Sequence, residues 1–153
     1  MLKTTGETTG LKIRTHTLTF RTERGPQFID ITDRVIQCVQ ESGVENGFAV
    51  VFSKHTTAAI TINENEPGLI SDLESMLSRM LPHDHPYDHN IDHPTINDEV
   101  PNGHSHCQHV FLGASEHIPV VGGRLTFGQW QRVFLVELDH AREREVVIQI
   151  LGW

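Results

Sequence analysis

Apolar and polar residues along this chain follow patterns typical of short strands. Runs rich in β-branched and aromatic residues are separated by Gly, Pro and Asn, which favour turns. These runs predict strands at residues 12–22, 28–31, 48–52, 58–62, 117–121, 131–138 and 146–151. The run at 48–52 is apolar throughout, so it predicts a strand buried on both faces.

Helical spacing of apolar residues is found in two segments, and capping residues suggest a third. Val35, Ile36 and Val39 form a stripe that Gly43 is placed to end. A second stripe runs from Ile70 to Met80, between Pro67 and Pro82. Asn102 can cap a third helix that reaches about Leu112. Between the second and third helices, residues 82–101 predict a long polar loop, which in a compact domain is usually functional or disordered.

These elements predict an α+β fold. Strands dominate, and about three helices are inserted between them, which favours a mixed, mainly antiparallel sheet of sandwich-like or barrel-like form. At 153 residues the chain suits one domain, and it is too short for a barrel of eight βα units. We expect a flexible polar N-terminus at 1–11 and a single domain at 12–153.

Composition narrows the classes of partner. The net charge of −8, with only 12 Lys and Arg spread through the chain, argues against nucleic-acid binding. No apolar run approaches the roughly 18 residues that a membrane span needs, and the first residues lack the apolar core of a signal peptide. Cys38 and Cys107 do not form a disulfide framework, so we expect a reducing, cytoplasmic location.

Histidine is the unusual residue of this composition. Seven of the 11 histidines lie between His83 and His109, many of them beside aspartates. Imidazole and carboxylate groups together suit a divalent metal ion, and this predicts a metal site. The simpler interpretation is a solvated loop, and it is the one we favour for His83, His85 and His93.

The segment at 102–109 contains three of these seven histidines, and their spacing leaves two arrangements open. On a regular helix His104 and His106 point to different faces, whereas His106 and His109 share one. Alternatively, His104 lies at the helix start, where the backbone geometry is looser. The spacing matches no standard zinc motif, and a hydrogen-bonded polar cluster at a subunit contact would explain the same residues.

Further polar residues follow predicted strands. His55 lies just after the apolar strand at 48–52, where a side chain is presented at a sheet edge. Arg124 precedes a strand, and Arg142 and Arg144 lie in the turn before the last strand. Arginine matches the geometry of phosphate and carboxylate groups, but for Arg144 we expect a solvated turn residue.

Several of these segments together resemble the YjbQ-type family, which is named for secondary thiamine-phosphate synthase activity. The resemblance extends from about Lys12 to Gly152. Each motif alone is a weak signal, and together the motifs are specific. The matching segments are HTTAAITINEN at 55–65, NGHSH at 102–106, LGAS at 112–115, IPV at 118–120, GRL at 123–125, FGQWQ at 127–131, and Glu137.

The resemblance implies a homotrimer of compact α+β domains with a histidine-rich site near subunit contacts. The polar site residues of the family map onto His55, Glu64, His89, Asp98, His104 and His106. The loop at 83–97 varies in the family, so its additional histidines need not belong to a shared site. His106 is a less secure ligand than His104, because some relatives have other residues there.

Two classes of function follow. The first is an enzyme that condenses hydroxymethylpyrimidine diphosphate with thiazole phosphate, as a main or a side activity, using a divalent zinc, manganese or magnesium ion. For it we predict metal ligands His55, His89, His104 and His106, catalytic residues Glu64 and Asp98, and substrate-binding residues Arg124, Arg142 and Gln131. A metal-dependent hydrolase would use the same residues. The second class is a non-catalytic trimeric protein that binds a metal ion or a small ligand.

Overall fold

The computed structural model describes residues 10–92 and 100–153 of the chain. Within them the chain forms eight strands and four helices. In chain order these are β1 (Lys12–Arg21), β2 (Gln27–Asp30), α1 (Thr32–Ser42), β3 (Asn46–Ser53), β4 (Ala58–Asn63), α2 (Pro67–Met80), α3 (Asp88–Asp92), α4 (Gly103–Leu112), β5 (Ser115–Val121), β6 (Arg124–Leu125), β7 (Arg132–Glu137) and β8 (Glu143–Gly152).

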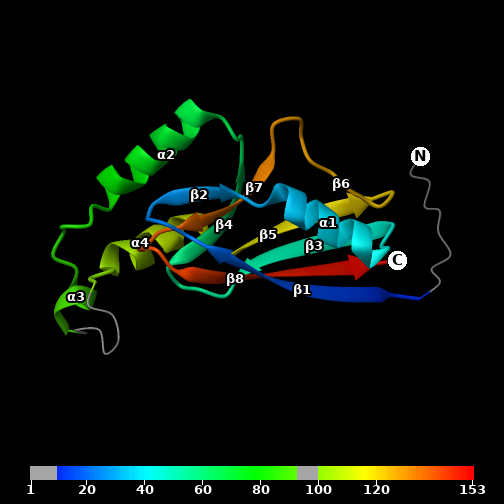
Figure 1. The fold of residues 1–153 in the computed structure, drawn as a ribbon, viewed down its shortest axis with the longest axis horizontal. Helices are drawn as coiled ribbons and strands as arrows, with labels where there is room; N and C mark the ends of the chain where they lie inside the picture. The colour runs from blue at the N-terminus through cyan, green and yellow to red at the C-terminus, as the bar shows by residue number, and fades with distance from the viewer. Residues whose placement is uncertain (1–9, 93–99) are drawn as a thin grey trace, which may run out of the picture.

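The strands form two antiparallel sheets. The large sheet has the order β1-β8-β3-β5-β6, and the small sheet has the order β2-β7-β4. Every pairing between the described strands is antiparallel. The predicted α+β fold with mainly antiparallel strands is therefore confirmed, and Figure 1 shows the long β1, β8 and β3 side by side.

The core lies between the two sheets. Alternate residues of β3 and β8, such as Val51 and Ile148, face Ile60 and Leu135 of the small sheet, and Val35 of α1 joins the same cluster. A second cluster covers the other face of the small sheet, where α2 and α4 pack on β4 and β7. The small sheet is thus covered on both faces, which explains why β7 is buried along almost its whole length.

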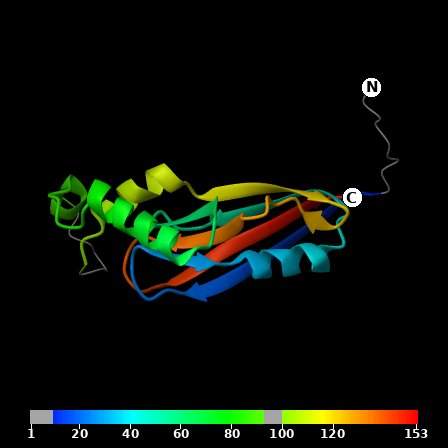
Figure 2. The ribbon, with the colours of Figure 1, turned by 90° about the horizontal axis from the view of Figure 1, so that it is seen from above.

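The helices α3 and α4 lie at one end of the molecule, and β6 and the C-terminus lie at the other end (Figures 1 and 2). Gly103, the first residue of α4, allows α3 to approach closely. A Cβ atom at this position would lie 2.6 Å from Cβ of Tyr87, which is too close for any side chain. The glycine therefore permits the histidine-rich segments at 83–92 and 103–109 to meet.

Strand β3 differs from its prediction. Its side chains alternate, with Ala49 and Val51 buried while Phe48 and Phe52 are 41% and 42% exposed. The prediction that this strand is buried on both faces is wrong, because no described element covers the outer face of the large sheet. An apolar run in the sequence does not show whether another element covers both faces of the strand.

Smaller differences concern segments that local patterns describe poorly. The short helix α3 lies inside the predicted loop at 82–101, and the two-residue strand β6 has too few residues to produce a pattern. Most of the predicted flexible N-terminus, residues 1–9, lies outside the described residues. Cys38 and Cys107 are free thiols, and among residues 10–92 and 100–153 no helix is long and apolar enough to cross a membrane.

Candidate functional site

Two hydrogen bonds fix the start of α4 against the turn between β7 and β8. The buried Ser105 hydroxyl donates to the backbone carbonyl of Leu138 over 2.7 Å. The side-chain amide of Asn102 donates to Oδ2 of Asp139 over 3.2 Å. Since His104 lies between Asn102 and Ser105 in sequence, these contacts place it beside the turn.

The Ser105 hydroxyl also determines the tautomer of His104. Nε2 of His104 lies 3.1 Å from the hydroxyl oxygen. Because the hydroxyl has one proton and donates it to Leu138, Nε2 must be the donor in the contact with His104. The lone pair is then on Nδ1, which is buried and has no hydrogen-bond partner among the described residues. A free imidazole lone pair can accept a proton or coordinate a metal ion.

His104 lines a polar pocket of about 280 Å³, close to the lower end of the range for small-molecule sites. The pocket lies between α4, the β7–β8 turn and the connection that follows β1. It is lined by Glu23, Arg24, Gly25, His83, Val100, His104, Asp139 and His140.

The ring of His104 is held in its neutral form. Burial lowers the pKa of His104, and the nearby His83 lowers it further, while the charge of Asp139 acts in the opposite direction. His83 packs against it with ring centroids 4.6 Å apart. His83 is an exposed loop residue, as predicted, but the prediction that it has no partner is wrong, since the folded loop returns it to the start of α4.

Asp139 is an ionised carboxylate whose oxygens are already engaged. It accepts hydrogen bonds from Nδ1 of His140 over 2.9 Å and from Nε of Arg142 over 3.1 Å, in addition to the bond from Asn102. Burial alone would raise the pKa of Asp139, but the bonds from Asn102 and His140 and the charge of Arg142 leave it lowered. Asp139 thus orients His140 and Arg142 at the edge of the pocket.

His106 and His89 form a separate pair. Their ring centroids are 4.7 Å apart. Burial, followed by the charge of His89, lowers the pKa of His106. The two-residue spacing on α4 directs His104 and His106 to different neighbours, as the helical spacing predicts.

His55 lies elsewhere, in the connection between β3 and β4. Its Nε2 accepts the backbone N–H of Glu145 over 2.8 Å, so this lone pair is occupied. Burial and then the charge of Arg144 lower the pKa of His55, which keeps the ring neutral. Within one chain His55 anchors its connection to β8, and it does not line the His104 pocket.

Arg144 is buried, and the prediction of a solvated turn residue is wrong. It is 4% exposed, and its Nε donates to Oε2 of Glu137 over 2.6 Å. Its Nη2 donates to the Thr57 hydroxyl over 2.9 Å, and the hydroxyl of Thr22 completes the site by donating to Glu137. The turn ends before Arg144, which is the second residue of β8 and points into the core because of the strand alternation.

The remaining predicted residues are divided among other places. Glu64 lines a separate pocket of about 400 Å³, and Gln131 accepts the backbone N–H of Gly128 next to it. Arg124 lines a third pocket, and Asp98 lies outside the described residues. Of the three predicted substrate-binding residues, Arg142 alone lies beside the His104 pocket within one chain. The roles of the others stay predictions.

The predicted metal ligands do not form one site within a single chain. Among residues 10–92 and 100–153, no three His, Cys, Asp or Glu side chains are placed to hold a metal ion together. Nδ1 of His104 is available, but the neighbouring Asp139 is bound to Arg142 and His140. A closed zinc site needs about four ligands, so the described part of one chain does not fit a metal ion by itself.

Comparison with known proteins places this architecture in a family. Residues 16–153 match the family described as UPF0047 protein YjbQ-like. The chain belongs to this family. The resemblance inferred from the motifs is confirmed, and it covers the sheets, the helices and the His104 pocket.

Relatives of this YjbQ-like chain align over nearly their full length. A UPF0047 protein of Methanothermobacter thermautotrophicus is 42% identical over 142 residues, which cover 93% of this chain and 94% of the relative. YugU of Bacillus subtilis is 34% identical, and the alignment covers 89% of this chain and 98% of YugU. The crystal structure of a YbjQ-like protein of unknown function from Sulfolobus solfataricus has a TM-score of 0.87 at 38% identity, covering 94% of this chain and 100% of that chain. These names give the family and no activity.

Several residues of the YjbQ-like pocket are absent from the sequence-based prediction. Ser105, Asp139 and His140 are the main examples, and Arg24 enters the pocket from the connection after β1. Asp139 and His140 follow a buried strand, which is the same signal that selected His55. Arg24 gave no local signal, because tertiary packing alone brings it to the pocket.

Proposed function

We propose that the His104 pocket is the active site of an enzyme that acts on a small phosphorylated substrate. The observation that carries this proposal is the buried Nδ1 of His104, which lacks a partner while Nε2 is held by Ser105. A buried acceptor left unsatisfied costs roughly 1–3 kcal/mol. A ligand that uses this lone pair would recover that cost, and such exceptions in native proteins often have a catalytic role.

Cationic groups around the pocket support a phosphorylated substrate. Arg24 lines the pocket, and its ion pair with Glu74, at 2.9 Å, holds the guanidinium in place. Arg142 lies at the edge, oriented by Asp139. The planar guanidinium group binds phosphate oxygens in pairs, so these two arginines are suited to hold a phosphate or diphosphate group.

The reaction that we propose is the condensation that the resemblance to the YjbQ-type family implies. The bond between the methylene carbon of the hydroxymethylpyrimidine and its diphosphate oxygen breaks, and diphosphate leaves with the electron pair. The thiazole nitrogen uses its lone pair to form the new bond to that carbon. Charge accumulates on the leaving diphosphate, where Arg24 and Arg142 would stabilise it.

Hydrolysis of a phosphorylated compound is the second candidate, and the tautomer of His104 favours it. The condensation needs no proton acceptor, whereas hydrolysis requires a base that takes a proton from water. A neutral histidine with its lone pair on Nδ1 is such a base.

One assay separates the two reactions. Purified protein is given hydroxymethylpyrimidine diphosphate and thiazole phosphate, and thiamine phosphate, phosphate and diphosphate are measured. We expect His104→Asn to lose at least about a hundredfold in the rate of phosphate release, because hydrolysis requires the histidine as a base. His85→Asn, an exposed histidine whose ring contacts Tyr87, should retain the wild-type rate. Phosphate release without thiamine phosphate supports hydrolysis, and full activity of His104→Asn excludes this pocket as the active site.

The predicted divalent metal ion is retained as a separate proposal, and the reaction above uses only side chains of the protein. Metal content would be measured after incubation with zinc, manganese or magnesium, for wild type, His104→Asn and His55→Asn. We expect His104→Asn to reduce the bound metal, because its Nδ1 is free, and His55→Asn to leave it unchanged, because its Nε2 is occupied. Absence of metal from the wild-type protein would contradict the proposal.

We also propose the homotrimer that the resemblance implies. The uncovered outer face of the large sheet supports self-association, since Ile13 of β1 and Phe48 and Phe52 of β3, two strands that both pair with β8, are between 41% and 50% exposed. Light scattering coupled to size exclusion would give the mass in solution. Phe48→Glu should reduce the mass if copies pack through this face, and a wild-type monomer would contradict the trimer.

A further inference from the structure

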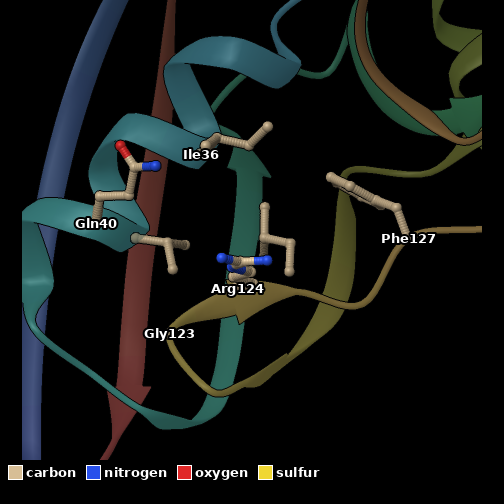
Figure 3. Close-up of a pocket in the computed structure, with 7 residues that line it drawn as sticks. Ile36, Gln40, Gly123, Arg124 and Phe127 are labelled. Atoms are coloured by element: carbon tan, nitrogen blue, oxygen red, sulfur yellow. The ribbon is translucent and has the colours of Figure 1, made fainter.

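The third pocket, of about 380 Å³, lies at the opposite end of the molecule from the His104 pocket. It is formed by α1 and by the segment that includes β6. Figure 3 shows Ile36 and Gln40 on α1, and Arg124 and Phe127 on the segment across the pocket. The residues that line it are Ile36, Val39, Gln40, Gly123, Arg124, Leu125 and Phe127.

The interior of this pocket is apolar and firmly supported. Val39 is buried, and Leu125 and Phe127 pack against the main core cluster. Ile36 completes the apolar wall from α1. Because these side chains rest on the core, the pocket is part of the packed structure and does not depend on a loose loop. Contact between water and this apolar surface is unfavourable, which favours the binding of an apolar group that displaces the water.

The polar side of the pocket is cationic. Arg124 is exposed, and it makes no hydrogen bond or ion pair with any described residue. In contrast, Arg132, Arg142 and Arg144 are each bound to a carboxylate of the protein. Arg124 therefore has its full set of donors available beside an apolar wall, in a chain whose net charge is −8.

We propose that this pocket binds an amphipathic organic anion, such as a medium-chain carboxylate. The apolar body of the ligand would lie against Ile36, Leu125 and Phe127, and its carboxylate would accept hydrogen bonds from Arg124. Small-molecule sites generally combine an apolar lining with a few polar groups that fix orientation. Arg124 supplies the charge complementarity, and Gln40 adds an amide at the rim.

The pocket is distinct from the exposed apolar face of the large sheet. Leu125 pairs with Val120, which is buried on the inner side of the sheet, so Leu125 also faces α1. Arg124 pairs with the exposed Val121 and contributes to the pocket from its rim. Phe48 and Phe52 are on the outer side.

Calorimetric titration of the full-length protein with octanoate tests the proposal, with 1-octanol as the neutral analogue of equal length. We expect octanoate to bind, and Arg124→Gln to weaken it by roughly tenfold or more, as expected for loss of a charge-assisted hydrogen bond. Arg34→Gln is the matched control, because Arg34 is exposed on α1, the helix that forms one wall of the pocket, and does not line the pocket itself. His104→Asn should bind octanoate like wild type, which separates this site from the proposed active site.

Three results would overturn the proposal. The first is that octanoate does not bind the wild-type protein. The second is that it binds Arg124→Gln and the wild-type protein equally. The third is a change in molecular mass of Arg124→Gln by light scattering, which would assign the pocket to a subunit contact. Ile36→Trp, which fills the apolar part, should abolish binding while circular dichroism shows a folded protein.

Discussion

Two acid–arginine pairs with opposite surroundings lie at the turn between β7 and β8, one on the strands that flank it and one within it. Glu137 and Arg144 form the inner pair, and Asp139 and Arg142 form the outer pair, each displaced by two residues from the other. The inner pair is sealed in the core, where Thr22, Thr57 and backbone N–H groups supply further hydrogen bonds. The outer pair lies at the edge of the pocket that contains the unpartnered Nδ1 of His104.

The comparison separates residues that stabilise the fold from residues that are suited to chemistry. A buried charge is tolerated when its hydrogen bonds are complete, and around Glu137 both carboxylate oxygens are engaged. The outer pair, Asp139 and Arg142, lies beside the unpartnered Nδ1 of His104 and beside solvent. Residue type alone therefore says little about role, and an unsatisfied group nearby, such as Nδ1 of His104, says more.

The largest effect is expected from breaking the inner pair. Glu137→Ala leaves Arg144 buried without its counter-charge, which costs about 3–5 kcal/mol of unfolding free energy. Chemical denaturation measures this loss. Arg21→Ala is the control, since its pair with Glu143 is exposed and contributes less than about 1 kcal/mol. Similar losses in both variants would contradict a special role for the sealed pair.

A smaller loss of stability is expected from the outer pair. Asp139→Ala removes the acceptor for Asn102, His140 and Arg142, and we expect it to cost about 1–3 kcal/mol, because His140 and Arg142 can turn to water. The reaction rate of Asp139→Ala, measured in the assay of the proposed function, should fall by a much larger factor than a loss of folded protein alone would cause. A loss of stability equal to that of Glu137→Ala would remove the distinction between the two pairs.

The mildest perturbation is acidification. The pKa values of His55, His104 and His106 are lowered in the folded state, mainly by burial. The unfolded chain then binds more protons, so stability is complete above the ordinary histidine pKa of about 6.5 and decreases as the pH falls below it. Each group contributes at most about 1.4 kcal/mol per pH unit. Urea denaturation between pH 7.5 and 5.5 measures the slope, which should be shallower in His104→Asn.

Local patterns predicted the strands and the three longer helices because burial repeats with the period of each element. The register of Phe48 and Phe52 was not predictable, since that depends on whether anything covers the outer face. Strand β6 has two residues and thus no period, and the two-sheet arrangement depends on contacts between distant strands.

The site was predicted less completely than the fold. Histidine density located the region of His104 and His106, but it could not separate His83, which contacts His104, from His85, which contacts Tyr87. The tautomer of His104 depends on the carbonyl of Leu138, a backbone group that no residue type reveals. Arg144 appeared to be a turn residue because strand ends are uncertain by one or two positions.

The hydrogen bond from Ser105 to Leu138 has a consequence for changes in chain length. The ring of His104 is aligned by a backbone atom of the turn, so an inserted or deleted residue between β7 and β8 would displace the carbonyl and release the ring. Loops normally accept insertions with little penalty. This turn should not, so engineering that requires a fused peptide or label should avoid the connection between β7 and β8.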